Sequence, residues 1–345
     1  MIRGLAILLV LLRHSWPAVF GTAGMVGVVV FFALSGYLIT GLLVSDLQRF
    51  GRVRYGRFYR NRALRLLPAL LLMLAGFAVV SLIWDPLGDK GTVPRSLIVG
   101  ITYTMNIPFD HGSAALSHLW TLATEEQFYL VWPLLLAVGM RYRKVRAVLV
   151  AAAGLIVLVM IATMTLTAPT IWRIYPLPTS WCIAMVIGAA GYFTAERLNG
   201  LLRRTTATRI VSGIVAIGVV LGLASLPEAK GAPTTYLIVG PLAAAATVVL
   251  VAHLRTWVTL PTVWLQPLRA LGLISYAAYL WNYPIHTWID TNPSFPAPGL
   301  STIALTLAAA IASWFVVEKP AMAFKARLDR RRQQDVSDPP VPQAV

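Results

Sequence analysis

The chain has 345 residues, of which 58% are hydrophobic and 12% charged, and its mean hydropathy is +0.72. A soluble globular protein carries about 25% charged residues, so this composition excludes a soluble globule and indicates a protein embedded in a bilayer. The formal charge of +16 does not indicate nucleic-acid binding, because the lysines and arginines lie in short connections between apolar stretches, as membrane topology requires.

Stretches of roughly 20 apolar residues, the length that spans a bilayer as a helix, recur along the chain. We predict an all-α polytopic transmembrane bundle of about ten spans, at 2–18, 24–45, 66–84, 118–140, 147–167, 174–194, 209–226, 234–253, 269–289 and 298–318. The first stretch is not followed by a small-residue cleavage site, so we interpret it as a retained span and not as a signal peptide.

Clusters of lysine and arginine predict which connections are cytoplasmic. The segment 49–65 holds seven arginines, and further basic clusters occur at 141–146, 197–209, 253–269 and 319–332. If the apolar segment 94–107 crossed the membrane, the cluster at 141–146 would lie outside. We therefore interpret 94–107 as re-entrant or interfacial, with both termini cytoplasmic.

The domain organisation is simple, since no internal repeat or soluble domain is visible in the sequence. We predict one membrane domain over residues 1–322 and a polar, Pro-rich cytoplasmic tail over 323–345, which we expect to be disordered. The single cysteine, Cys182, lies in an apolar run and the five histidines show no ligand spacing, so we predict neither a disulfide framework nor a metal site.

His14 lies inside the first predicted span, eleven residues after Arg3. Eleven residues make three helical turns plus about 20°, so the two share a face about 16 Å apart, with Arg3 at the cytoplasmic end and His14 near mid-membrane. A neutral imidazole can take a proton from a hydroxyl near pH 7, which suits a general base. A structural histidine bonded to a neighbouring helix fits the same position, and Arg3 alone can be a topology anchor.

Glu125 and Glu126 lie about two turns into a predicted span, where isolated charges cost several kcal/mol. His118 and Glu125 are seven residues apart and are expected to face the same way. The adjacent glutamates diverge by about 100°, so we expect only one of them to face a given pocket. A carboxylate there can orient an imidazole, hold an arginine, relay protons, or form a buried salt bridge without chemistry.

Arg62 and Arg65 share a helical face at the cytoplasmic mouth of the third span. Arginine forks bind phosphates, so the pair can grip a nucleotide-bearing donor, although positive-inside loops carry arginines in any case. In the ninth span, the buried amide of Asn282 is equally explained by an interhelical hydrogen bond. Packing is the first interpretation of the segment 31–37.

Six segments occur in the order and spacing of the acyltransferase 3 family of membrane acyltransferases, which the chain resembles. They are Arg3 to Ala6 with His14 ("RGLA…H"), Phe31 to Thr40 ("FFxLSGxLIT"), Phe58 to Ala69 ("FYxRRxxRLxPA"), His118 to Pro133 ("HLWSLxxEEQFYLxWP"), Ile274 to Ile285 ("ISYxxYLWHxPI") and Glu318 to Pro320 ("ExP"). The chain departs from the pattern in having Asn61 for the first arginine of the pair and Asn282 for the late histidine. Relatives have residues ahead of "RGLA", so we expect a start upstream of Met1 or a short first span.

The resemblance implies an integral membrane O-acyltransferase of a bacterial-type cell membrane. It would move an acyl group, often acetyl, from acyl-coenzyme A to a hydroxyl of a glycan or sugar-bearing acceptor. It implies that His14 activates the acceptor hydroxyl or carries the acyl group, that Glu125 or Glu126 orients His14, and that Arg62 and Arg65 hold the donor phosphates with Arg3 lining the path. Acyl-coenzyme A would be a substrate and no cofactor would be permanently bound. We expect the stand-alone form, without the extracytoplasmic hydrolase-like domain of some relatives.

The alternative is a proton-coupled transporter or exporter that uses the same intramembrane histidine and glutamates as a relay. Transporters show repeated halves with broken spans in matching positions. No such pairing is visible here, so the sequence favours the acyltransferase.

Overall fold

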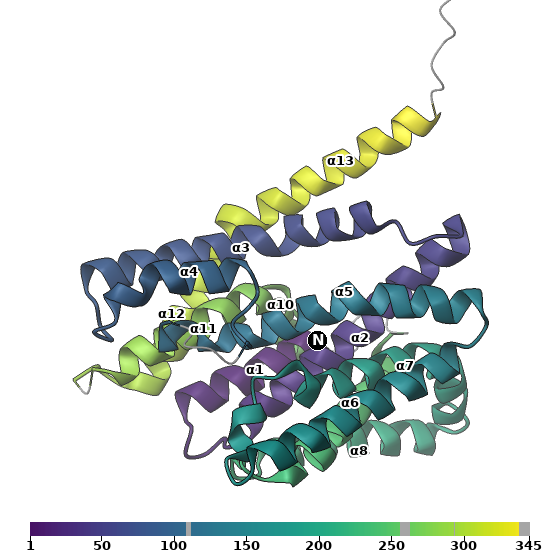
Figure 1. The fold of residues 1–345 in the computed structure, drawn as a ribbon, viewed down its shortest axis with the longest axis horizontal. Helices are drawn as coiled ribbons and strands as arrows, with labels where there is room; N and C mark the ends of the chain where they lie inside the picture. The colour runs from purple at the N-terminus through teal and green to yellow at the C-terminus, as the bar shows by residue number, and fades with distance from the viewer. Residues whose placement is uncertain (108–111, 256–262, 293, 338–345) are drawn as a thin grey trace, which may run out of the picture.

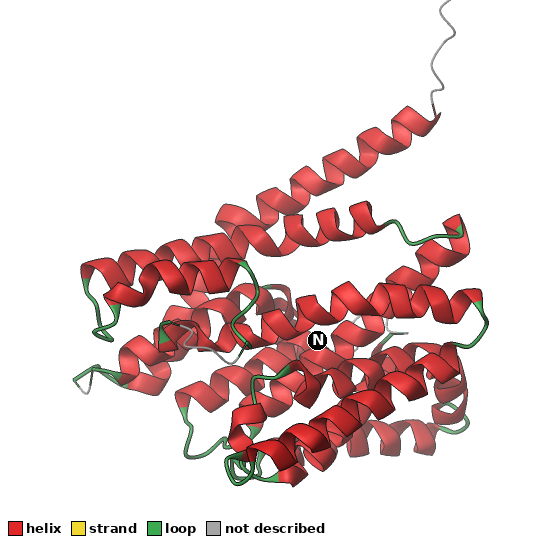
Figure 2. Cartoon of the chain, viewed as in Figure 1, coloured by secondary structure: helices red, strands yellow, loops and turns green. Residues whose placement is uncertain are grey.

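The structure is a computed structural model that describes residues 1–107, 112–255, 263–292 and 294–337. These residues fold almost entirely into helices, and no strand occurs among them (Figure 2). The α-helices are α1 (Ile2–Ser15), α2 (Ala23–Phe50), α3 (Tyr55–Ile83), α4 (Val93–Ile101), α5 (Trp120–Arg141), α6 (Val145–Thr167), α7 (Pro178–Leu202), α8 (Thr206–Ala224), α9 (Gly240–Leu254), α10 (Gln266–Leu273), α11 (Ser275–Asp290), α12 (Pro298–Ser313) and α13 (Lys319–Ser337). Two π-helical stretches, η4 (Thr235–Val239) and η6 (Trp314–Glu318), lead into α9 and α13.

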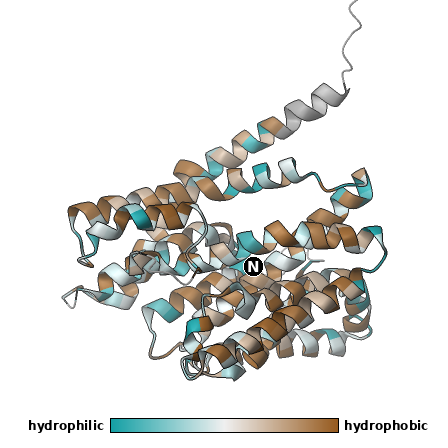
Figure 3. Ribbon diagram, viewed as in Figure 1, coloured by the Kyte–Doolittle hydropathy of each residue, from teal (hydrophilic) through white to brown (hydrophobic). Residues whose placement is uncertain are grey.

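The helices run back and forth, so that their connections gather at two ends of the bundle (Figure 1). The α2–α3, α5–α6 and α7–α8 connections lie at the right of the view, and the α1–α2, α3–α4 and α11–α12 connections at the left. The basic clusters at 49–65, 141–146 and 197–209 therefore share one end, where Figure 3 also shows hydrophilic residues. We call this the inner end and the opposite one the outer end.

Six helical segments are long and apolar enough to cross a membrane: Ala23–Phe50, Tyr55–Ile83, Val145–Thr167, Thr206–Ala224, Thr235–Leu254 and Pro298–Leu328. The remaining predicted spans correspond to α1, α5, α7 and α11, which are shorter or more polar. The all-α multi-pass fold is confirmed, and the count of ten depends on these four.

The flanks of α6 and α8 expose large apolar side chains, such as Val150, Leu158 and Ile214, to the surroundings of the bundle. A soluble monomer rarely exposes such continuous apolar surface, whereas lipid tails cover it at no cost. The segment 94–107 forms only the nine-residue helix α4, which rises about 14 Å, less than half of the hydrocarbon core. It is therefore too short to cross as a helix, in agreement with the re-entrant or interfacial interpretation.

The first helix is shorter than predicted. α1 ends at Ser15, and Trp16 has φ −140° and ψ 70°. Pro17 follows, and a residue before proline is pushed out of the helical conformation. His14 thus lies in the last turn of α1, and its depth near mid-membrane stays a prediction.

The tail that we expected to be disordered continues as α13 as far as Ser337, and the rest of it, 338–345, lies outside the described residues. Lysine, arginine, glutamine and alanine dominate this helix and all favour helical backbone. The prolines on which the expectation rested, Pro339, Pro340 and Pro342, come after it.

α2 and α7 cross at very short range. A methyl group at Gly36 would lie 2.0 Å from the carbonyl oxygen of Met185, and one at Gly188 would lie 1.9 Å from the carbonyl oxygen of Ala33. Only glycine allows this approach, as at other small-residue helix crossings in membranes. The packing interpretation of 31–37 is therefore confirmed for Gly36, and the crossing fixes the turn of α2 that carries Ser35.

Candidate active site

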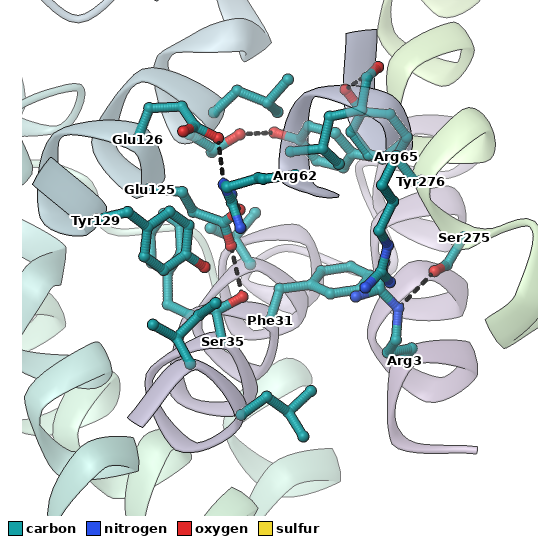
Figure 4. Close-up of a pocket in the computed structure, with 18 residues that line it drawn as sticks. Arg3, Phe31, Ser35, Arg62, Arg65, Glu125, Glu126, Tyr129, Ser275 and Tyr276 are labelled. Carbon is teal, nitrogen blue, oxygen red and sulfur yellow. Dashed lines mark hydrogen bonds and ion pairs between the residues drawn. The ribbon is translucent and has the colours of Figure 1, made fainter. Parts of the chain in front are cut away.

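An inner cavity of about 120 Å³ lies where α1, α2, α3, α5 and α11 meet near the inner end (Figure 4). Its polar lining consists of Arg3, Ser35, Arg62, Arg65, Thr121, Glu125, Glu126, Tyr129, Ser275, Tyr276 and Tyr279. It contains all the predicted site residues except His14.

Arg62 occupies the centre of an ion-pair network in the inner cavity. Its Nε lies 2.7 Å from Oε1 of Glu126, its Nη2 lies 3.6 Å from Oε2 of Glu125, and its guanidinium lies 3.7 Å from the ring centroid of Tyr129. Ser35 donates a 2.8 Å hydrogen bond to Glu125. The expectation that only one glutamate faces a pocket was wrong, because both side chains bend toward the same arginine. This network neutralises the charge of Arg62 within the protein.

Arg3 and Arg65 are in a different electrostatic position. Arg3 donates a 3.1 Å hydrogen bond to Ser275, which is uncharged, and Figure 4 shows the side chain of Arg65 pointing toward that of Arg3. Neither arginine has a carboxylate partner in the part of the chain that the structure describes. Glu318 acts on both arginines electrostatically without forming an ion pair, so their N–H donors remain available to an anion such as a phosphate.

A basic vestibule of about 410 Å³ continues the inner cavity toward the inner end, since Ile39, Arg62 and Arg65 line both. The other charged side chains of its wall are those of Asp46, Arg49, Arg54, Arg57 and Lys325. Asp46 is paired with Arg54 at 2.9 Å. Most of the remaining charge in the vestibule is positive, so the route into the inner cavity is electrostatically favourable for anions.

A larger outer cavity of about 750 Å³ lies on the other side of the bundle centre and contains His14. The polar and aromatic residues that line it are Arg13, His14, Ser117, His118, Trp120, Trp172, Arg173, Tyr175, Glu228, Lys230, Tyr279, Tyr283 and His286. The volume lies within the range of about 300–1,000 Å³ that is usual for small-molecule sites.

The imidazole of His14 is held by one short hydrogen bond. Its Nδ1 lies 2.5 Å from Oδ1 of Asn282, while Nδ2 of Asn282 donates to Oγ1 of Thr306 at 3.3 Å. The bond to Thr306 orients the amide so that its oxygen faces His14, and His14 therefore donates from Nδ1. The lone pair of the neutral ring is then on Nε2, the arrangement that a general base requires. Asn282 thus forms an interhelical hydrogen bond, as one interpretation of the sequence expected. Its partner is His14, the candidate base.

Two further histidines surround the same site. The ring of His286 is stacked on His14 with centroids 5.3 Å apart, and the ring of His118 is stacked on Tyr283, also at 5.3 Å. His286 did not emerge from the sequence. The available signal was its position four residues after Asn282, which places both side chains on one face of α11.

The predicted contact between His14 and a glutamate is not present. His118 belongs to the 3₁₀ helix η2 (Ala114–Leu119), and α5 begins only at Trp120. The spacing of seven residues therefore does not lie within one α-helix, and His118 faces the outer cavity while Glu125 faces the inner one. The expectation that Glu125 or Glu126 orients His14 was wrong, and Asn282 takes that place.

The two cavities have only Val28 and Tyr279 in common among their lining residues. The hydroxyl of Tyr279 donates to the carbonyl oxygen of His118 at 3.0 Å and lies 2.7 Å from Oγ1 of Thr121. Tyr279 belongs to the segment Ile274 to Ile285, but no feature of that segment singled it out.

A family model described as an acyltransferase domain matches residues 1–318. The YrhL protein of Bacillus subtilis is 31% identical over 354 aligned positions, which cover 92% of this chain and 54% of YrhL. The peptidoglycan O-acetyltransferase OatA of Listeria monocytogenes is 27% identical over 331 positions, which cover 89% of this chain and 52% of OatA.

The chain thus spans about half the length of these relatives. No solved structure matches it. The family model covers nearly the whole membrane part. It includes every lining residue of the two cavities, and every residue of the vestibule wall except Lys325. The chain therefore belongs to the acyltransferase 3 family of integral membrane acyltransferases.

Proposed function

We propose that this chain transfers an acetyl group from acetyl-coenzyme A, bound from the inner end, to a hydroxyl of a glycan or sugar-bearing acceptor in the outer cavity. The observation that carries the proposal is the hydrogen-bonded orientation of His14, which leaves Nε2 free to act as a base beside a cavity large enough for a sugar. The O-acetyltransferase named among the relatives supports the same chemistry.

Coenzyme A carries several phosphates at one end and the reactive thioester at the other. The basic vestibule and the pair Arg3 and Arg65 suit the phosphates, because several of their cations, among them Arg3 and Arg65, form no ion pair with a carboxylate among the described residues. Arg3 and His14 are separated by about 16 Å along α1, a distance that the long pantetheine arm can bridge. The thioester would then reach the boundary of the two cavities near Tyr279.

The proposed step needs no group other than these residues and the two substrates. Nε2 of His14 takes the proton of the acceptor hydroxyl while the hydroxyl oxygen attacks the thioester carbonyl carbon. The carbon–sulfur bond then breaks, and the imidazolium returns the proton to the departing thiolate. The products are an acetyl ester and free coenzyme A.

The test uses the purified protein in lipid nanodiscs with acetyl-coenzyme A carrying a radiolabelled acetyl group. The acceptor probe is the disaccharide of N-acetylglucosamine and N-acetylmuramic acid, a fragment of the glycan named for the Listeria relative. We expect label in the disaccharide, and His14→Ala to lower the rate by about 100-fold or more, the usual contribution of a general base.

His253→Ala is the matched control. His253 contacts Ser212 at 3.0 Å and lines neither cavity, so its loss is expected to leave the transfer rate unchanged. A His14→Ala protein with the melting temperature and the activity of the native chain would contradict the proposed role of His14. Labelled free acetate without labelled ester, in the native protein, would contradict transfer to this acceptor.

A further inference from the structure

The outer cavity has a positively charged wall that the chemistry of His14 does not need. Arg13, Arg173 and Lys230 line it, and Glu228 is the only carboxylate among its described lining residues. Outer connections of membrane proteins are usually poor in lysine and arginine. In this chain the outer end has few of them, namely Arg13, Lys90, Arg95, Arg173 and Lys230. Arg13, Arg173 and Lys230 face the same cavity, and the charge distribution that membrane topology requires does not explain this clustering.

The loop that carries two of the charged groups is built into the fold. Oγ1 of Thr22 donates to the carbonyl oxygens of Leu226 and Pro227, at 2.6 and 2.9 Å. Farther along, Thr235 donates to the carbonyl oxygen of Ala229 at 2.6 Å, and Tyr236 to that of Lys230 at 2.7 Å. These bonds fix the backbone from 226 to 230, so the charged side chains are held in place before any ligand binds.

Glu228 holds Arg13 and Lys230 in place and leaves several of their N–H donors available. Its Oε2 lies 2.5 Å from Nη2 of Arg13, and its Oε1 lies 2.9 Å from Nζ of Lys230. A guanidinium has five N–H donors and an ammonium has three, so both cations keep donors for a second acceptor. Arg173 has no carboxylate partner among the described residues and lies with its Cζ 5.9 Å from the ring centroid of Trp172.

We propose that Arg13, Arg173 and Lys230 form a subsite for an acidic group on the acceptor, a carboxylate or a phosphate, and that the acceptor is therefore an acidic glycan. Arg13 directly precedes His14, so an acid held at this wall places the rest of the sugar beside the base. The aromatic rings of Trp120, Trp172, Tyr175 and Tyr283 complete the lining with flat apolar surfaces. The statement that this ligand is the acceptor rests on the proposed function. The statement that an acidic group binds at this wall does not depend on it.

The experiment measures equilibrium binding by calorimetry to the full chain in nanodiscs, without acetyl-coenzyme A. One arm compares the N-acetylglucosamine–N-acetylmuramic acid disaccharide with its methyl ester, which lacks only the negative charge. The other arm compares N-acetylglucosamine 1-phosphate with N-acetylglucosamine. We expect at least one acid to bind about tenfold tighter than its neutral partner, the effect of one charge-assisted contact. The arm that shows the preference identifies the acid as carboxylate or phosphate.

Arg173→Gln and Lys230→Gln are each expected to remove most of this preference, and Lys90→Gln to leave it intact. Lys90 also belongs to the outer end but does not line the cavity. Arg173 forms no ion pair among the described residues, so its variant is expected to keep the native melting temperature and to remain informative if Lys230→Gln loosens the loop.

Equal binding of both acids and their neutral partners overturns the inference, and so does a preference that survives both substitutions. If the acid preference and its loss are observed but no acetyl transfer occurs, the subsite stands and the proposed function fails. Transfer that is equally fast to acid and ester, with equal KM values, supports the proposed function and overturns the subsite.

Discussion

The Nδ1 atom of His14 lies 2.5 Å from Oδ1 of Asn282, so residues 268 positions apart in the chain meet in one hydrogen bond. Asn282 is fully buried and is held from its other side by Thr306. The family pattern has a histidine where this chain has Asn282. The asparagine still supplies an acceptor to the ring nitrogen of His14 that does not face the cavity.

Asn282→Ala is expected to lower kcat of acetyl transfer by about 10- to 100-fold, the usual cost of losing a residue that orients a reactive side chain. The KM values for donor and acceptor are expected to stay unchanged, because Asn282 lines neither cavity. Steady-state kinetics on both substrates give the answer. Asn282→Asp keeps the acceptor oxygen and is expected to retain more activity than Asn282→Ala; equal kcat in the native chain and in Asn282→Ala would rule out the orienting role.

Arg62 and Arg65 are expected to have separable roles although both line the inner cavity. Arg62→Gln leaves Glu125 and Glu126 without their cation, and breaking such a partly buried network costs about 3 kcal/mol. A lower melting temperature in nanodiscs is therefore expected. Adding Glu126→Gln is expected to restore part of the loss, and additive effects of the two changes would argue against the pairing.

Arg65→Gln is expected to raise KM for acetyl-coenzyme A by about tenfold and to leave the melting temperature near that of the native chain. Arg65 forms no ion pair among the described residues, and the nearby carboxylate of Glu318 keeps its electrostatic interaction with Arg3 when Arg65 is removed. Titration of coenzyme A against both proteins measures the change directly. Unchanged affinity in Arg65→Gln would remove Arg65 from the donor site.

The crossing of α2 and α7 gives a prediction about stability. Gly36→Ala and Gly188→Ala each place a methyl group within about 2 Å of a backbone oxygen, so each is expected to destabilise the protein by about 1–3 kcal/mol or more. Gly218→Ala on α8 is the control, since nothing lies within 4 Å of its added methyl group. Thermal unfolding of the three variants tests the close crossing, and three equal midpoints would contradict it.

Glu228 gives a prediction about pH. Burial acts to raise the pKa of Glu228, but the hydrogen bonds and charges of Lys230 and Arg13 outweigh it, and the pKa lies below its ordinary value of 4.5. A carboxyl group with a lowered pKa in the folded state stabilises the fold above pH 4.5, and the contribution is lost as the pH falls through the lowered value. Below pH 4.5 the melting temperature of the native chain is therefore expected to fall more steeply than that of Glu228→Gln. Parallel curves would show that the ion pairs do not stabilise the loop.

The helical fold and the side chains of the site could be recognised from the sequence to different degrees. The apolar stretches predicted each of the six helices that are long and apolar enough to cross a membrane, because a bilayer imposes one length and one composition on any span. The distribution of lysine and arginine over the connections, and not the length of the segment, indicated that 94–107 does not cross. The helix ends were less predictable, as at Pro17, where one local backbone restriction shortened α1.

The pairing of side chains between helices was the part that sequence could not predict. Helical phase indicates only which residues share a face of one helix. It does not indicate which other helix supplies the partner, so a glutamate was expected to orient His14 where the structure has Asn282. It also fails where a helix begins later than assumed, as between His118 and Glu125.

The position of Tyr279 between the two cavities bears on the electrical potential across the membrane. The inner and outer cavities both carry polar linings, and Tyr279 and Val28 are the residues they share. If water fills each cavity from its own side, most of the transmembrane voltage falls across the layer that contains this tyrosine. The phenol is tied at its oxygen to Thr121 and to the backbone of His118, which keeps it in place. Under the proposed function, the layer that insulates the membrane is also the layer that the acyl group must pass.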